Sequence, residues 1–287
     1  MKYSLLLVPL VGMAAATTPA SSADVKARAD PDDLMIFVCD QMPEVCTNMC
    51  YGAYCLDIGT SLHYDKASAS EKRNRRKAAG CIASGGNRCS TKKGHDSGYQ
   101  CDEYPFASTT ANGNVATRVN RCVPAGENRK QGGVINAFYK KTSYCNGGPC
   151  SFDVEFSNAG DMDYCEATSS SDSQCQTHDD NEVPGPGTGS AGDGDEAGDG
   201  TDDDGGNPEP QKRSVARRYR TSSGLEISIK RGAVLGQRAV TVLPRNATLW
   251  DEQARSDVFD SEDGDDEYDY MLDNLEVRED TIVEEIL

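Results

Sequence analysis

The apolar residues of this chain fall in short runs whose spacing predicts strands and helices. Leu34–Val38 is a continuous apolar run, which is typical of a buried first strand. Phe152–Phe156 alternates apolar and acidic side chains and predicts the last strand of a folded domain. Residues 115–123 alternate well enough for a further strand that leaves Arg118 and Arg121 available to solvent or substrate.

Two segments between these strands have the start signals of helices. Pro43 suits the first turn of one helix, in which Cys46 and Cys50 would share a face and attach the helix to the core. Ser68 and Glu71 form a capping-box pattern ahead of a run of basic residues that ends at a glycine. We therefore expect a short, strongly basic helix there.

A third helix is predicted at residues 127–139, because Val134, Ile135 and Phe138 have helical spacing. The glycine pair at 132–133 costs this helix ~1 kcal/mol per glycine relative to alanine. Such a cost is easier to understand if the backbone passes close to another group.

The composition changes after residue 175. Residues 176–212 are rich in Asp and Gly and should form a disordered, self-repelling linker. Residues 213–250 are basic and contain two β-prone runs, 225–229 and 240–243, which predict a small hairpin. Residues 251–287 are acidic, and we expect a mostly disordered tail that is at most weakly helical at its end.

Charge and cysteine content place the folded domain at residues 30–175. That segment is close to charge balance, although the whole chain has a formal charge of -18. All 12 cysteines lie in it, without the Cys-x-x-Cys pair that would favour zinc. We expect them to form disulfides in an oxidising compartment. They are Cys39, Cys46, Cys50, Cys55, Cys81, Cys89, Cys101, Cys122, Cys145, Cys150, Cys165 and Cys175.

Residues 1–20 have the three regions of a signal peptide, and their apolar run is too short to span a bilayer. We therefore expect a secreted, extracellular protein that acts as a monomer and has no membrane span. If the source is eukaryotic, Asn246 heads an Asn-Ala-Thr glycosylation acceptor.

The stretch Cys101–Thr109 carries the most informative chemistry. Asp102 and Glu103 are adjacent, so in an extended strand they face opposite sides. Pro105 limits how the strand continues. One carboxylate can therefore face a cleft while the framework holds the other.

The run Asp102-Glu103-Tyr104-Pro105-Phe106-Ala107, followed by Glu127-Asn128-Arg129 and the glycine pair, resembles the signature of the NucA/NucB deoxyribonucleases. The resemblance covers roughly residues 34–145, with Glu71-Lys72-Arg73 as a weaker match. It implies a small α+β domain with a ββα-metal-like core of antiparallel strands plus helices. It also implies metal-dependent hydrolysis of phosphodiester bonds in DNA.

The resemblance also implies roles for individual residues. Glu103 would be the general base that activates water, and Asp102 would orient it, tune it or assist the metal. Glu127 would act in catalysis or as a ligand. The metal would be Mg or Mn, held by Asn128, with Glu127, or Gln131 as the alternative, as a ligand bound directly or through water.

A basic surface is the expected partner of the phosphate backbone. The residues expected to contact DNA are Lys72, Arg73, Arg75, Arg76, Lys92, Lys93, Arg121 and Arg129. Many family members have Asp-Arg before the acid pair, whereas this chain has Gln100-Cys101. Lys92, Lys93 or Arg121 would have to replace that arginine, and a disulfide would brace the corner. His95, just before the motif, could assist as an acid or base.

Two other functions fit parts of the sequence. A secreted, cysteine-rich binding module needs no catalytic carboxylates, and it would keep any DNA affinity after Glu103→Gln. A glycosidase could pair Asp102 or Glu103 with Glu127, but neutral glycans do not need the five basic residues of the predicted helix. A nuclease should lose turnover in Glu103→Gln while still binding DNA.

The acidic tail suggests two further interpretations. It could occupy the basic cleft until cleavage near Lys212-Arg213 releases it, or it could only aid solubility. Residues 193–204 imitate a calcium loop, but they lack flanking helices and have alanine at the fifth position.

Overall fold

The computed structural model describes residues 33–83, 86–111, 117–160, 162–167, 169–176, 180–181, 217–229, 233–255 and 272–286. All of them belong to one compact unit, Asp32–Leu287. The predicted signal peptide, the calcium-loop imitation and nearly all of the predicted linker lie outside the described residues. The α+β class and the disulfide-rich character predicted from the sequence are confirmed.

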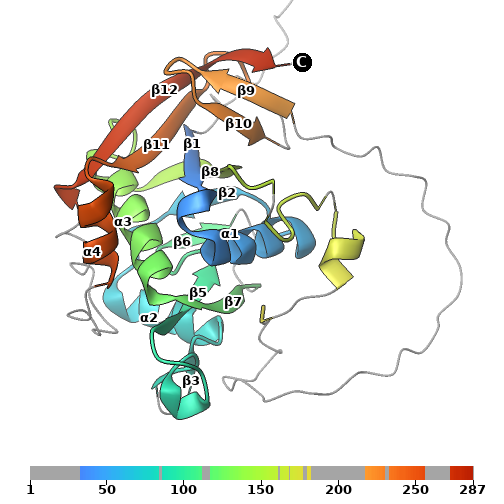
Figure 1. Ribbon diagram of the computed structural model, residues 1–287, viewed down its shortest axis with the longest axis vertical. Helices are drawn as coiled ribbons and strands as arrows, with labels where there is room; N and C mark the ends of the chain where they lie inside the picture. The colour runs from blue at the N-terminus through green and yellow to red at the C-terminus, as the bar shows by residue number, and fades with distance from the viewer. Residues whose placement is uncertain are drawn as a thin grey trace, which may run out of the picture. The chain divides into compact units, whose positions relative to one another are not determined.

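Six strands form a closed ring in which each strand is hydrogen-bonded to the next. In ring order they are β1 (Asp33–Val38), β11 (Arg238–Pro244), β12 (Leu275–Ile286), β9 (Arg217–Thr221), β10 (Glu226–Ile229) and β8 (Cys150–Ser157). Strand β1 pairs in parallel with residues 152–157 of β8 over the whole length of β1, whereas β10 meets β8 at the single pair Ser228–Phe156. Strands β2 (Ser61–Tyr64) and β6 (Thr109–Ala111) extend the sheet from β8. Figure 1 shows β9–β12 gathered above β1 and β8.

The apolar run at the first strand is explained by burial on both of its faces. Leu34 and Ile36 point to a small core inside the ring, which also contains Tyr219, Ile227, Ile229, Ala239 and Ile282. Met35 and Phe37 point the other way, into the main core beneath the helices. A strand buried on both faces has no polar side to interrupt its sequence.

Two helices follow β1 in the order predicted. Helix α1 (Pro43–Cys50) has proline in its first turn, and helix α2 (Ala69–Ala78) begins with the complete Ser68–Glu71 capping box. The cysteines of α1 attach it to the core as expected, because Cys46 is bonded to Cys39 and Cys50 to Cys165.

Every cysteine is in a disulfide. The six bonds are Cys39–Cys46, Cys50–Cys165, Cys55–Cys175, Cys81–Cys101, Cys89–Cys122 and Cys145–Cys150. They all lie within residues 39–175, so no disulfide holds the strands that follow residue 216 in the ring.

A second, two-stranded sheet stands apart from the ring. Strand β5 (Tyr99–Tyr104) pairs antiparallel with β7 (Val119–Pro124), which leads directly into helix α3 (Ala125–Lys141). A small hairpin, β3 (Ile82–Ala83) and β4 (Gly86–Asn87), precedes them. The order β5, β7, α3 gives the strand-strand-helix layout that the sequence predicted.

The end of the chain differs from the sequence prediction. The run 225–229 does form a hairpin, but with Arg217–Thr221, whereas the run 240–243 lies in β11 between β1 and β12. The expected disordered tail contains the twelve-residue strand β12. Helix α4 (Ala247–Arg255) precedes it. Charged side chains on the outward positions of β12 conceal the strand pattern, because only two of its residues are buried.

Candidate active site

The acid pair lies near the end of β5, where a cis peptide bond joins Tyr104 to Pro105. Tyr104 is fully buried and its hydroxyl donates to the Gly59 carbonyl. Arg118, expected to face solvent or substrate, is 3 % exposed instead. It donates to the carbonyls of Pro105, Phe106 and Thr109, because these carbonyls turn inward where the chain leaves β5. The corner is therefore a rigid, internally bonded turn.

Asp102 faces helices α1 and α3. Its carboxyl group is 2 % exposed and accepts a hydrogen bond of 2.9 Å from Asn48 Nδ2 of α1. Burial raises the pKa of Asp102 to about 8; the hydrogen bond from Asn48 opposes this rise, and the charge of Glu103 adds to it. Gln131 of α3 also acts on this carboxyl group, yet its Nε2 has no hydrogen bond of normal geometry within the described residues.

Glu103 faces the opposite side of β5, as expected for adjacent residues of a strand. Its Oε1 accepts a hydrogen bond of 3.1 Å from the Ala107 amide, and Arg76 Nε of α2 lies 3.8 Å from the same oxygen. The Cys81–Cys101 disulfide borders it, with Cys81 Sγ 3.7 Å from Oε2. This disulfide braces the corner, as the Gln100-Cys101 departure led us to expect.

Glu127 lies in the first turn of α3 and contacts the start of α1. Its Oε2 accepts hydrogen bonds from the amides of Glu44 at 2.8 Å and Val45 at 3.4 Å. Burial raises the pKa of Glu127; these amide hydrogen bonds and the charge of Lys130 oppose the rise, and the charge of Glu44 adds to it. A carboxylate at a helix N-terminus is also favoured by the helix dipole.

The other two predicted metal ligands on α3 have different surroundings. Asn128 Nδ2 donates to Gln100 Oε1 of β5 at 3.0 Å, so this amide ties α3 to β5. Gln131 is one helical turn after Glu127 and is 4 % exposed. Glu127 and Gln131 therefore share the α3 face that meets α1, where Asp102 also lies.

The donor atoms near Asp102 fit a hard divalent cation. Asp102 offers carboxylate oxygens, and the buried Oδ1 of Asn48 has no hydrogen-bond partner among the described residues. Glu127, which is hydrogen-bonded to the first amides of α1, offers a second carboxylate where α3 meets that helix. Mg and Mn accept such oxygen ligands and need few of them, because they keep several waters. A buried carboxyl group with a raised pKa also gains its charge more easily beside a cation.

A different cluster has the spacing of metal ligands but the wrong chemistry. Among the described residues, Cys89, His95 and Cys122 place one ligand atom each within 4.8 Å of one another. Cys89 and Cys122 are bonded to each other as a disulfide, so neither offers a thiolate. His95 Nε2 lies 3.6 Å from Cys122 Sγ of this disulfide.

The predicted DNA-contacting residues divide into a surface group and a buried group. Arg73, Lys92 and Lys93 are exposed, and Lys72 and Arg76 are partly exposed. Arg75, Arg121 and Arg129 instead serve the fold. Arg75 pairs with Asp65 and donates to the Ala107 carbonyl, Arg121 pairs with Glu44 at 2.7 Å, and Arg129 is 5 % exposed.

The sequence prediction missed two residues of this site, Glu44 and Asn48. Both lie on α1, more than 50 residues before the acid pair in the sequence. Glu44 pairs with Arg121 beside Glu127, and Asn48 bonds Asp102. Nothing in the local pattern marks them, although the proline that starts α1 shows where a first-turn acid such as Glu44 would lie.

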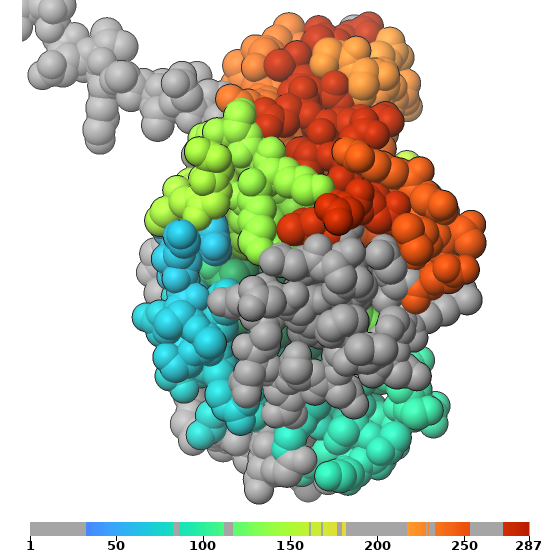
Figure 2. Space-filling view, turned by 90° about the vertical axis from the view of Figure 1, so that its left-hand side faces the viewer, coloured from blue at the N-terminus to red at the C-terminus, as the bar shows by residue number. Residues whose placement is uncertain are grey.

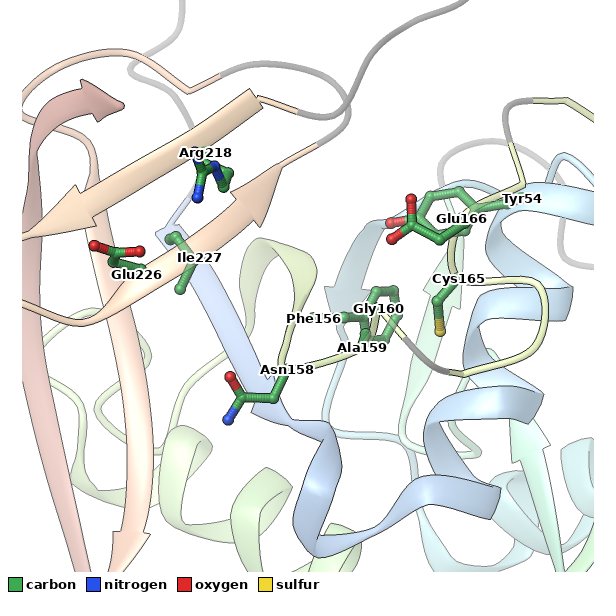
Figure 3. A pocket seen from close by; sticks show the side chains of 10 residues that line it. All are labelled: Tyr54, Phe156, Asn158, Ala159, Gly160, Cys165, Glu166, Arg218, Glu226 and Ile227. Atoms are coloured by element: carbon green, nitrogen blue, oxygen red, sulfur yellow. The ribbon is translucent and has the colours of Figure 1, made fainter. Parts of the chain in front are cut away.

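A cavity of about 220 Å³ lies elsewhere, where β8 and β10 diverge. Figure 3 shows Phe156 and Asn158 on one side, with Arg218, Glu226 and Ile227 of the β9–β10 hairpin on the other. None of the predicted site residues lines it. In the part of the chain that the structure describes, no helix is long and apolar enough to cross a membrane.

The fold and the site define a class of protein: a disulfide-braced α+β domain in which a strand-strand-helix unit brings acidic and amide side chains together. Residues 49–154 match the family model of Deoxyribonuclease NucA/NucB. No curated protein and no solved structure matches the chain. The matched segment contains β5, β7 and α3 but not β1 or anything from β9 onward.

Proposed function

We propose that this chain is a secreted, metal-dependent endonuclease that hydrolyses phosphodiester bonds of DNA at the site between β5, α1 and α3. The observation that carries the proposal is that Asp102 and Gln131, both inside the family-matched segment, meet at a buried position beside Asn48, while Glu127 is hydrogen-bonded to the start of the same helix α1. Secretion is supported by twelve cysteines that are all in disulfides.

Asp102 is the stronger candidate for the general base. The sequence favours Glu103, but Glu103 faces α2 and binds the Ala107 amide, whereas Asp102 faces the helix that bears Glu127. A carboxylate with a pKa close to neutral can accept a proton from water at physiological pH. Asn48 would hold the Asp102 carboxylate in place, and Glu103 would keep the corner rigid.

The metal would be Mg or Mn, held by Glu127 with the Asn48 amide oxygen and waters, which leaves Asp102 to act as the base. When bound, it would supply positive charge to the phosphate that reacts. The α1 amides orient Glu127, and Asn128 fixes the distance between α3 and β5 through Gln100. The chain's own residues thus position the acids before DNA binds.

DNA would lie across α2 and the turn that contains Lys92 and Lys93. Lys72, Arg73 and Arg76 belong to α2, and Arg76 also reaches toward Glu103 of the acid pair. The exposed cations suit phosphate contacts, which give affinity without sequence preference. Arg75, Arg121 and Arg129 have their roles inside the fold and are not part of this surface.

The test is a plasmid-nicking assay on the full-length chain with Mg or Mn, with and without EDTA. Asp102→Asn should lose about 100-fold or more in rate, because a general base typically contributes that much. Glu127→Gln should also lose activity, because it removes the charged ligand of the metal. Both variants should still bind DNA. Asp163→Asn changes an exposed carboxylate in the same domain and should leave the rate unchanged.

Glu103→Gln decides between the two acids. A loss as large as that of Asp102→Asn, with Asp102→Asn retaining activity, would return the role of base to Glu103. The absence of metal-dependent nicking by the unmodified chain would refute the nuclease proposal and favour the binding module. Cleavage of a neutral glycan instead would favour the glycosidase.

A further inference from the structure

Helix α3 is contacted from outside by residues that the family-matched segment does not include. Trp250 of α4 is 2 % exposed and packs on Gly133 of α3. A Cβ atom built at Gly133 would lie 3.3 Å from one carbon of the Trp250 ring and 3.5 Å from Leu275 Cδ1. Gly133 is two residues after Gln131, so this contact lies directly behind the candidate site. The close approach also explains why this helix has glycine at that position.

Polar contacts join both ends of α3 to α4 and β12. Near its start, Lys130 Nζ lies 2.5 Å from Asp251 Oδ1 of α4. At its end, Lys141 Nζ donates to the Leu275 carbonyl at 3.2 Å. Just beyond, the amide and hydroxyl of Ser143 each donate to Glu279 of β12 at 2.7 Å.

The arrangement brings two distant parts of the sequence together. Figure 1 shows α4 beside α3, and Figure 2 shows the red end of the chain packed against the green residues that follow α3. The contacts from α4 and β12 are spread along the whole helix, so its position depends on both elements. Glu127 and Gln131 lie away from Gly133 on α3 and contact α1 and Asp102, respectively, and the charge of Lys130 acts on Glu127.

We propose that α4 and β12 form a clamp that positions helix α3, and that Trp250 and Asp251 are positioning residues for the candidate active site. Neither residue touches the acids. Trp250 sets how close α3 lies to α4 through its contact with Gly133, and Asp251 fixes the second turn of α3 through Lys130. The effect on catalysis rests on the function proposed above, whereas the effect on α3 itself does not.

The first test uses full-length Trp250→Ala, with Leu249→Ala as its control because Leu249 is the neighbouring residue on α4 and is 40 % exposed. Hydrogen exchange of the α3 amides should accelerate about tenfold in Trp250→Ala, because local opening costs less without the contact. The kcat for DNA should fall about 100-fold with little change in KM, since misplacement of catalytic groups by a distant mutation can cost that much. Trp250→Phe should recover a large part of both effects, and Leu249→Ala should show neither.

A second pair of variants covers the case in which Trp250→Ala does not fold. Asp251→Asn removes the contact to Lys130 at the surface, and Glu252→Gln changes the adjacent exposed carboxylate of the same helix. Asp251→Asn should speed exchange of the α3 amides around Lys130 and lower kcat, whereas Glu252→Gln should do neither. Unchanged α3 exchange in both Asp251→Asn and a folded Trp250 variant would overturn the clamp. If the unmodified chain does not cleave DNA, the proposed function fails, but the exchange measurements still decide the clamp.

Discussion

At the scale of single residues, Asp102 is the least ordinary side chain in the site. It is an acid buried to 2 % exposure, its neighbour in the sequence is another acid, and its described side-chain hydrogen bond comes from the neutral Asn48. Burial without a cationic partner disfavours the charged form. The folded structure therefore favours the protonated form of Asp102, whereas the proposed role of general base requires the ionised form.

This conflict predicts how stability depends on pH in the metal-free chain. The pKa of Asp102 is raised from its usual value of 3.8 to about 8 in the folded state. The folded protein therefore holds a proton that the unfolded chain releases, so the contribution to stability is complete below about pH 4 and is lost as pH rises through about 8. Asp102→Asn mimics the neutral acid and should remove this loss.

Urea unfolding in EDTA between pH 5 and 9 measures the effect. The unmodified chain should lose stability toward pH 9 more steeply than Asp102→Asn does. Asp163→Asn is the matched control and should follow the unmodified chain. Parallel curves for Asp102→Asn and the unmodified chain would mean that Asp102 is not protonated in the folded state.

At the scale of elements, α2 and α3 have separate tasks. Helix α2 has no buried residues, and the capping box holds its start. Helix α3 is buried on several sides and carries the site. A helix with cations on its surface and no buried face is available for a charged partner.

The proposed binding of DNA by α2 can be tested by measuring how affinity depends on salt concentration. Lys72→Gln together with Arg73→Gln should weaken DNA binding at low salt, and the slope of log K against log salt should fall by about 1 for each phosphate contact removed. Fluorescence anisotropy on a labelled duplex at several salt concentrations gives the slope. Arg278→Gln removes an exposed cation of β12 and should leave the slope unchanged. An unaltered slope in the double variant would place the DNA elsewhere.

The sequence was a good guide wherever a local signal exists. The strand at β1, the proline start of α1, the capping box of α2 and the disulfide state of the cysteines were all predicted and are confirmed. These features depend on neighbouring residues or on composition. The contacts of Asp102 could not be predicted, because Asn48 is joined to it only by the packing of α1 against β5.

The ring strands after residue 216 show the reverse case. The sequence of β12 resembles an acidic tail, because only two of its residues are buried and most of the others are exposed or partly exposed. The glutamates among the latter are Glu276, Glu279, Glu284 and Glu285. Glu284 and Glu285 face the arginines of β9, and Glu279 faces Arg238 of β11. The described part of the tail therefore meets the basic segment 213–250 as a neighbour in the sheet and does not lie on α2. Residues 256–271, where many of the acids lie, are outside the described residues.

At the scale of the whole molecule, the end of the chain completes the fold. Ile282 of β12 is 1 % exposed and belongs to the core inside the ring, whereas its neighbour Val283 is 49 % exposed. Ile282→Ala should therefore cost about 2–5 kcal/mol of unfolding free energy. Val283→Ala, which removes a similar side chain from the other face, should stay within about 0.5 kcal/mol. Urea denaturation of the two variants compares them directly, and equal losses would mean that β12 does not have this register.

The clamp changes what removal of the tail should do. A tail that only blocked a basic cleft would raise nuclease activity when it is removed. If the tail instead closes the ring and supports α3, its removal should lower both nuclease activity and stability. A rise in nuclease activity on removal of the tail would therefore indicate a blocking tail, and a fall would indicate a tail that supports α3.

Trp250 is the only tryptophan in the chain. The tryptophan emission of the whole protein, excited selectively over its 12 tyrosines, therefore reports on one place, the junction of α4 with Gly133 of α3, and needs no added dye. Circular dichroism reports on all helices and strands together. If the emission shifts to the red at a lower urea concentration than the dichroism signal falls, the junction opens while the disulfide-bonded domain stays folded.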